Sequence, residues 1–132
     1  MSQLVGKWKL DRSENFEEFL MAIDVGAIQR KVMSKVSPVT EITNDDQGNW
    51  KIEISTAIKT NVSTFKLGEV FDDCSPSGGT RKAIASLEGD TLVVNPHEDP
   101  EGATITREIV DGELVMTLAK GGAIAKRFFK KA

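Results

Sequence analysis

The chain has 132 residues and a net charge of −3 at pH 7, with 17 Lys and Arg against 20 Asp and Glu. This length predicts one compact domain over residues 1–132, and the lack of a basic excess argues against nucleic-acid binding. Hydrophobic residues make up 39% and charged residues 28%, as in folded soluble proteins and unlike disordered or fibrous ones.

The first residues carry no signal for secretion or membrane insertion. Lys7 and Lys9 interrupt the apolar run that a secretory leader needs, and no stretch approaches the roughly 18 apolar residues of a membrane span. The single cysteine, Cys74, excludes an intrachain disulfide framework and suits a reducing compartment. We therefore expect a soluble, cytoplasmic protein.

After a first strand, the segment 15–35 has the periodicity of helices. It contains no proline, and its only glycine is Gly26. Two sets of residues recur at helical spacing: Phe16, Phe19, Leu20 and Ile23, then Ile28, Val32 and Lys35 or Val36. Each set predicts one helix face, and Ser13 or Asn15 is a suitable N-cap for the first helix. Pro38 ends the second.

From Asn49 onward the sequence is a succession of short segments separated by turns. Trp50, Ile52 and Ile54 alternate with charged residues, as in a strand with one wet face. Asp/Gly and Gly/Gly turns recur about every 8–12 residues, which predicts an antiparallel sandwich or barrel. One small helix pair cannot cover both faces of so many strands. We therefore expect a closed barrel with room for one small ligand.

Two late strands carry an arginine on the face that alternation predicts to be internal. In 103–110 the apolar face contains Arg107, and in 123–130 the face opposite the lysines contains Arg127. We can assign no inward carboxylate to pair with either arginine. A buried, unpaired guanidinium is costly, so a ligand carboxylate is the predicted partner. The alternative is a one-residue shift of register, which would turn the arginine to water.

Short motifs along the whole chain resemble one known family. They are Gly6-Lys7-Trp8-Lys9-Leu10, Asn15-Phe16, Arg30-Lys31-Val32, Phe65-Lys66-Leu67-Gly68, Phe71-Asp72, Arg81-Lys82, Thr104-Ile105-Thr106-Arg107 and Arg127-Phe128-Phe129. In this combination they are similar to the intracellular lipid-binding proteins, which comprise the cytosolic fatty-acid-binding proteins and their retinoid-binding relatives. The resemblance implies an all-β fold, a ten-stranded antiparallel up-and-down barrel (a clam) with a helix-turn-helix lid.

The resemblance also implies a carboxylate site. Arg107 and Arg127 would hold the ligand carboxylate, with Thr40 and Phe129 beside them. Two arginines are typical of the fatty-acid and retinoic-acid binders, whereas the retinol-binding branch is expected to carry glutamines. Phe129 stands where the family has a tyrosine, and the chain contains no tyrosine. Thr40 or an ordered water would have to replace the missing hydroxyl.

The entrance and upper cavity are predicted to be lined by apolar residues: Phe16, Met21, Val25, Ile28, Met33 and Ile58. Ordinary core packing is the stronger alternative for Phe16, whereas the resemblance implies that Ile58 lies at a strand turn facing the helices. Three basic residues of the second helix, Arg30, Lys31 and Lys35, either meet anionic membranes during lipid transfer or form a solvated helix face.

No arrangement of residues indicates catalysis. The only histidine, His97, and Cys74 lie in different loops, and no set of residues has the spacing of metal ligands. We therefore predict a monomeric carrier of one long-chain fatty acid that is not an enzyme and needs no cofactor or metal. The alternatives are a retinoic-acid-binding protein of the same fold, a membrane-stacking structural protein, which the net charge disfavours, and, more weakly, a lipid isomerase.

Overall fold

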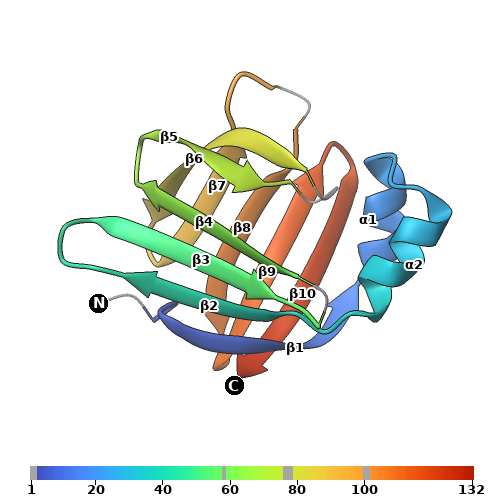
Figure 1. Cartoon of the computed structure of the whole chain (residues 1–132), viewed down its shortest axis with the longest axis horizontal. Helices are drawn as coiled ribbons and strands as arrows, with labels where there is room; N and C mark the ends of the chain where they lie inside the picture. The colour runs from blue at the N-terminus through green and yellow to red at the C-terminus, as the bar shows by residue number, and fades with distance from the viewer. Residues whose placement is uncertain (1–2, 58, 76–78, 100–101) are drawn as a thin grey trace.

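The computed structural model describes residues 3–57, 59–75, 79–99 and 102–132 (Figure 1). Its elements in chain order are β1 (Gly6–Glu14), α1 (Phe16–Ala22), α2 (Ala27–Lys35), β2 (Val39–Asn44), β3 (Asn49–Ser55), β4 (Thr60–Lys66), β5 (Val70–Cys74), β6 (Thr80–Glu88), β7 (Thr91–Pro96), β8 (Thr104–Val110), β9 (Glu113–Lys120) and β10 (Ala123–Lys131). Neither helix of the described chain is long and apolar enough to cross a membrane.

The ten strands form one antiparallel sheet in the order β4-β3-β2-β1-β10-β9-β8-β7-β6-β5. Strands that follow one another along the chain pair with each other, except β4 and β5. Because β1 also pairs with β10, the sheet curls into a barrel (Figure 1). The helix pair stands at one end of this barrel. The predicted ten-stranded barrel with a helix-turn-helix is confirmed.

The barrel is nearly closed, with one break between β4 and β5. These strands are the two ends of the sheet, and no backbone ladder joins them among the described residues. We call this place the seam. Side chains bridge it: the ring of Phe65 stacks on that of Phe71, with 4.7 Å between centroids, and Trp50 lies on the other side of Phe65.

Two clusters of buried side chains fill the interior. The aromatic cluster contains Trp8, Trp50, Phe65, Phe71 and Phe129, together with Leu4 and buried aliphatic residues of five strands, β2, β3, β6, β7 and β9. The helix-side cluster packs Phe16, Phe19, Leu20 and Val25 against Ala103, Ile105, Leu118 and Ala125. Met116 contacts both clusters. The clusters are therefore continuous through the middle of the barrel.

The first helix has the buried face that its sequence predicts. Phe16, Phe19 and Leu20 of α1 are all buried. Asn15 is the N-cap residue and has a φ of 57°, but its side chain makes no capping hydrogen bond. Packing on the barrel, rather than a side-chain cap, therefore holds the start of α1 in place.

The second helix differs from expectation. No residue of α2 is buried, and Ile28 is 83% exposed. The apolar face of this helix is therefore not a core face like that of α1. The reason is that α2 lies largely over a hollow: Val32 and Met33 line it, and Met33 also packs against the helix-side cluster.

Replacing Phe65 by alanine removes the ring that bridges the seam. We expect the free energy of unfolding, measured by urea denaturation, to fall by about 3–5 kcal/mol, because a large aromatic side chain leaves a buried cavity. Thr64→Ala, at the exposed neighbouring position, is the matched control and should change it by less than about 0.5 kcal/mol. Equal effects of the two substitutions would contradict this role.

Candidate functional site

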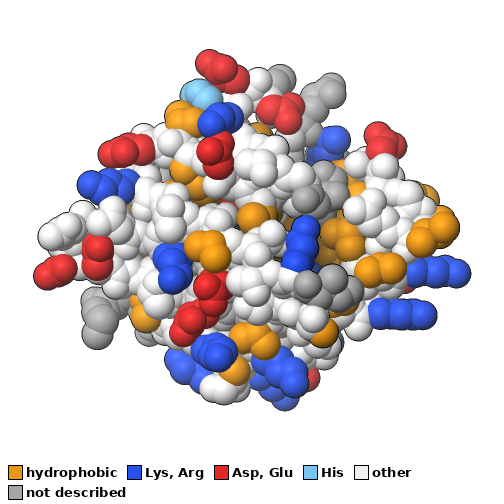
Figure 2. Space-filling model, viewed as in Figure 1, with side chains coloured by type: hydrophobic (Ala, Val, Ile, Leu, Met, Phe, Trp, Pro, Cys, Tyr) orange, Lys and Arg blue, Asp and Glu red, His pale blue; other side chains and the backbone are white. Residues whose placement is uncertain are grey.

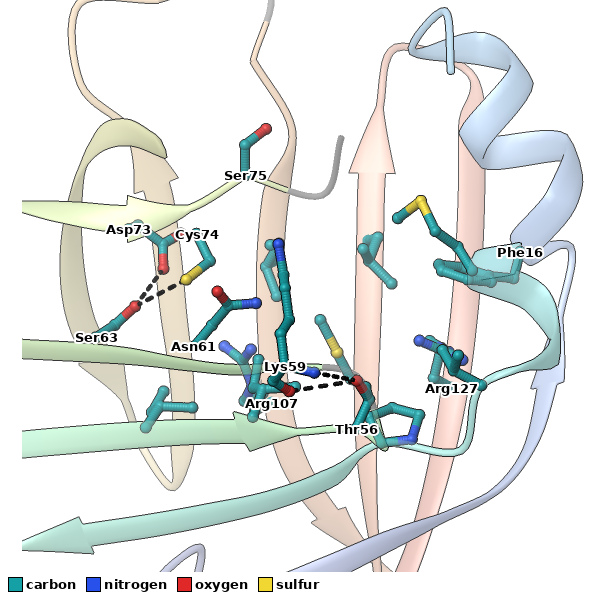
Figure 3. Close-up of a pocket in the computed structure, with 18 of the residues that line it drawn as sticks. Phe16, Thr56, Lys59, Asn61, Ser63, Asp73, Cys74, Ser75, Arg107 and Arg127 are labelled. Atoms are coloured by element: carbon teal, nitrogen blue, oxygen red, sulfur yellow. Dashed lines mark hydrogen bonds between the residues drawn. The ribbon is translucent and has the colours of Figure 1, made fainter. Parts of the chain in front are cut away.

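A cavity of about 340 Å³ lies between the helix pair and the strands. Its apolar walls come from the helices and three strands, β3, β8 and β9: Phe16, Val32, Met33, Ile52, Ile54, Ile105, Met116 and Leu118. Polar side chains also face it: Lys59, Asn61, Ser63, Asp73, Cys74, Arg107 and Arg127 (Figure 3). The space-filling view shows hydrophobic side chains in the recess between helices and barrel (Figure 2). A small number of polar groups in a mostly apolar hollow is typical of a small-molecule site.

Arg107 reaches the cavity from the middle of β8. The strand alternates as predicted, so Ile105 and Arg107 point inward, and Arg107 is only 6% exposed. It makes no hydrogen bond or ion pair with any residue that the structure describes. Burial lowers the pKa of Arg107, and the nearby Asp73 carboxylate partly offsets this. The guanidinium is therefore a cation without a direct partner.

Arg127 faces the same cavity from β10 and is 8% exposed. Its Nε donates to Ser13 Oγ at 3.0 Å, and the guanidinium lies 3.9 Å from the centroid of the Phe16 ring. One terminal nitrogen is buried with no partner. Burial lowers the pKa of Arg127 to about 10, which still leaves it positively charged at neutral pH.

The strand register places the two arginines at one level of the barrel. Arg107 lies opposite Met116, and Met116 lies opposite Arg127. Two strand spacings separate their backbones by about 10 Å. Side chains as long as arginine's can span much of that distance, so one anion between them is within reach of both.

The structure corrects the expectation that no carboxylate points inward. Asp73 on β5 lines the cavity, and its Oδ2 lies 3.4 Å from Nε of Arg81 on β6. Arg81 also donates to the carbonyl oxygen of Ala103, and its other terminal nitrogen is buried with no partner among the described residues. Alternation from the buried Phe71 would have placed Asp73 inside. Asp73 makes its ion pair with Arg81 and acts on Arg107 only through space.

Sequence reasoning also missed three polar residues at the seam. Asn61 and Ser63 on β4 line the cavity, as does Cys74 at the end of β5. The sequence predicts a loop position for Cys74, but Cys74 is the last residue of β5, and its Sγ lies 3.6 Å from Ser63 Oγ. A period of two counted back from the buried Phe65 would have identified Asn61 and Ser63.

The predicted cavity and entrance residues occupy three kinds of position. Phe16 and Met33 line the cavity, whereas Val25 packs in the helix-side cluster. Met21 is 58% exposed, and Ile28 is more exposed still; neither lines the cavity. Ile58 lies outside the described residues.

Thr40 and Phe129 are buried but are not among the described residues that line the cavity. Thr40 is on β2 opposite Trp8, and Phe129 packs within the aromatic cluster. The two arginines therefore share the cavity with each other, but not with these two neighbours. Among the described residues, no group of His, Cys, Asp and Glu could hold a metal ion.

A curled, nearly closed barrel with a helical lid, an apolar hollow and buried cations defines a lipid-binding barrel. The family model described as "Lipocalin / cytosolic fatty-acid binding protein family" matches residues 5–131. The chain belongs to this family. It is therefore a lipid carrier rather than an enzyme.

Individual relatives extend this assignment. The chain is 38% identical over 124 residues to the muscle fatty acid-binding protein of Schistocerca gregaria, covering 94% of this chain and 92% of the relative. It is 31% identical to sodium/calcium exchanger regulatory protein 1 of Doryteuthis pealeii, covering 98% and 97%. Its structure matches a Schistosoma mansoni fatty acid binding protein in complex with arachidonic acid, with a TM-score of 0.90, 26% identity and coverage of 100% and 98%.

Asp73→Asn tests the inward ion pair. Removing one partner of a mostly buried pair leaves Arg81 and Arg107 without a nearby anion, so we expect the free energy of unfolding to fall by about 3 kcal/mol in urea denaturation. The matched control is Asp72→Asn, because Asp72 pairs with Lys82 on the outer surface, where both side chains are 63% exposed. The control should lose less than about 1 kcal/mol. A larger loss in the control would contradict the assignment.

Proposed function

We propose that the protein binds one long-chain fatty acid inside the barrel, with the hydrocarbon chain in the cavity and the carboxylate held between Arg107 and Arg127. The observation that carries this proposal is the pair of buried guanidinium groups without an anion of their own. The inward carboxylate, Asp73, is already engaged by Arg81. A free acid supplies the missing negative charge.

The energetics favour an acid over a neutral lipid. Removing an ion from water costs several kcal/mol unless it is paired and hydrogen-bonded. A carboxylate accepts several hydrogen bonds at once, and bonds between ionised partners are about twice as strong as neutral ones. The partnerless terminal nitrogen of Arg127 can donate one of them. An ester lacks the charge and gains much less.

We propose further that the protein works as a cytoplasmic monomer and that its helix pair touches anionic membranes when ligand is transferred. The exposed apolar residues Met21 and Ile28 lie on the helices together with the exposed Lys31 and Lys35. Figure 2 shows hydrophobic and basic side chains side by side on that part of the surface. Such a mixed face suits the boundary between headgroups and acyl chains.

Arg30 is set apart from this basic surface. Its Nη1 donates to the carbonyl oxygen of Val25 at 2.7 Å, and the side chain is half-buried. It therefore ties α2 to the turn that joins the two helices. The membrane-facing charge is left to Lys31 and Lys35.

Displacement of a fluorescent probe by oleate, methyl oleate and retinoic acid tests the ligand proposal. We expect oleate to bind most tightly, and Arg127→Ala to weaken oleate about 10- to 100-fold, because a charge-assisted hydrogen bond is lost. The affinity for methyl oleate should change little in the same variant. Lys126→Ala, at the exposed neighbouring position of β10, is the control. Equal affinities for acid and ester, unmoved by Arg127→Ala, would refute the ion pair, and tighter retinoic acid would favour the retinoid alternative.

Transfer of a fluorescent fatty acid to vesicles tests the membrane contact. The double variant Ile28→Ser with Lys31→Glu should slow transfer to anionic vesicles several-fold and have less effect with neutral vesicles. Lys51→Glu makes the same charge change on the exposed face of β3 and serves as the control. If both variants transfer at the wild-type rate, the ligand leaves by diffusion without a helix-mediated collision.

A further inference from the structure

Polar side chains gather at the seam, away from Arg127. The seam group consists of four side chains of β4 and β5 that line the cavity: Asn61, Ser63, Asp73 and Cys74. Figure 3 shows them on one side of the cavity, with Arg107 next to them and Arg127 on the other side, beside Phe16. The cavity thus has two separate polar regions.

The hydrogen-bonding capacity of the seam group is not used up within the protein. Ser63 Oγ lies 3.5 Å from Asp73 Oδ1 and 3.6 Å from Cys74 Sγ, which are long, weak contacts. The side-chain amide of Asn61 makes no hydrogen bond with any described residue. An amide carries two donors and an acceptor, and a hydroxyl can donate and accept. The seam group therefore offers donors and acceptors to whatever fills the cavity.

Arg107 adds a positive charge to this region. Asp73 favours the charged form of Arg107, whereas Arg81 opposes it, so all three groups are electrostatic neighbours. Because Asp73 pairs with Arg81, two guanidinium groups share one carboxylate, and a net positive charge remains beside Asn61 and Ser63. An electron-rich oxygen on a ligand would be attracted there.

Arg127 is held apart from the seam. Ser13 and Phe16 anchor its guanidinium under α1, and burial lowers its pKa. The backbones of the two arginines are about 10 Å apart. An unsubstituted fatty acid must satisfy both cations with one carboxylate, whereas a ligand with a second oxygen farther along its chain can give each cation a partner.

We propose that Asn61, Ser63 and Arg107 form a second polar subsite, which binds a neutral oxygen in the middle of a lipid chain, such as the hydroxyl group of a hydroxy fatty acid. This inference rests on the proposed function: in a hydroxy fatty acid the carboxylate stays at Arg127, and Arg107, which shares the carboxylate of an unsubstituted acid, binds the hydroxyl instead. The hydroxyl accepts a hydrogen bond from Arg107 and donates one to the oxygen of Asn61 or Ser63. A second carboxylate fits less well, because it would approach the negative charge of Asp73.

Whether a hydroxy fatty acid binds more tightly or more weakly than its parent acid distinguishes such a subsite from an apolar wall. A hydroxyl group buried without a hydrogen bond is disfavoured, so an apolar cavity would bind a hydroxy fatty acid more weakly than its parent acid. A subsite with a cationic donor reverses the order. Oleate and ricinoleate are a suitable pair, because ricinoleate is oleate with one hydroxyl group in mid-chain.

The experiment measures the dissociation constants of oleate and ricinoleate by probe displacement. We expect the wild type to bind ricinoleate about tenfold more tightly than oleate. In the double variant Asn61→Leu with Ser63→Ala, this preference should disappear: the dissociation constant of ricinoleate should equal or exceed that of oleate. This holds whether or not the affinity for oleate itself changes. Thr64→Ala, on the outer face of β4, should keep the wild-type ratio.

Two results would overturn the subsite. One is ricinoleate binding more weakly than oleate in the wild type, as an apolar wall requires. The other is a preference for ricinoleate that survives in the double variant. Failure of the proposed function looks different, because oleate would then bind no more tightly than methyl oleate and would not respond to Arg127→Ala.

Discussion

Burial of Arg107 and Arg127 in a mostly apolar hollow is the constraint on which the rest of this barrel depends. Both guanidinium groups lose most of their hydration, and the pKa of each falls for that reason. Contacts within the protein offset this desolvation cost only in part. Arg127 rests on the Phe16 ring and the Ser13 hydroxyl, while Arg107 has only the attraction of Asp73 through space. The missing component is negative charge, which an acid ligand brings with it.

The break in the sheet between β4 and β5 borders the same interior. Where β4 and β5 separate, aromatic stacking of Phe65 on Phe71 takes over from backbone hydrogen bonds. Beyond the rings, the inward positions of these strands become polar, and Ser63 and Asp73 face each other across the gap. The seam therefore combines an apolar closure with a polar wall. That wall gives the cavity a chemical character that a fully aliphatic barrel would lack.

The two helices have different physical roles although their apolar spacing is similar. α1 is part of the core, because Phe16, Phe19 and Leu20 fill the barrel end. α2 has no fully buried residue, packs only the partly buried Met33 against the helix-side cluster, and covers the hollow with Val32 and Met33. An element with few buried contacts opens at low free-energy cost, so α2 is the part of the lid best suited to move when ligand enters. Arg30 holds it to the turn between the helices by one hydrogen bond, to the carbonyl oxygen of Val25.

The sequence by itself determined the barrel, the position of the helix pair and the inward direction of Arg107 and Arg127. These follow from local rules, because side chains alternate along any strand and a two-residue period needs no knowledge of distant segments. The same rule applied to Phe65 and Phe71 would have placed Ser63 and Asp73 inside. Tertiary structure alone decided that Asp73 pairs with Arg81, that Cys74 faces the cavity and that Ile28 stays in water. Each of these depends on which surface meets the residue across space, and helical spacing cannot tell a packed core from a hollow.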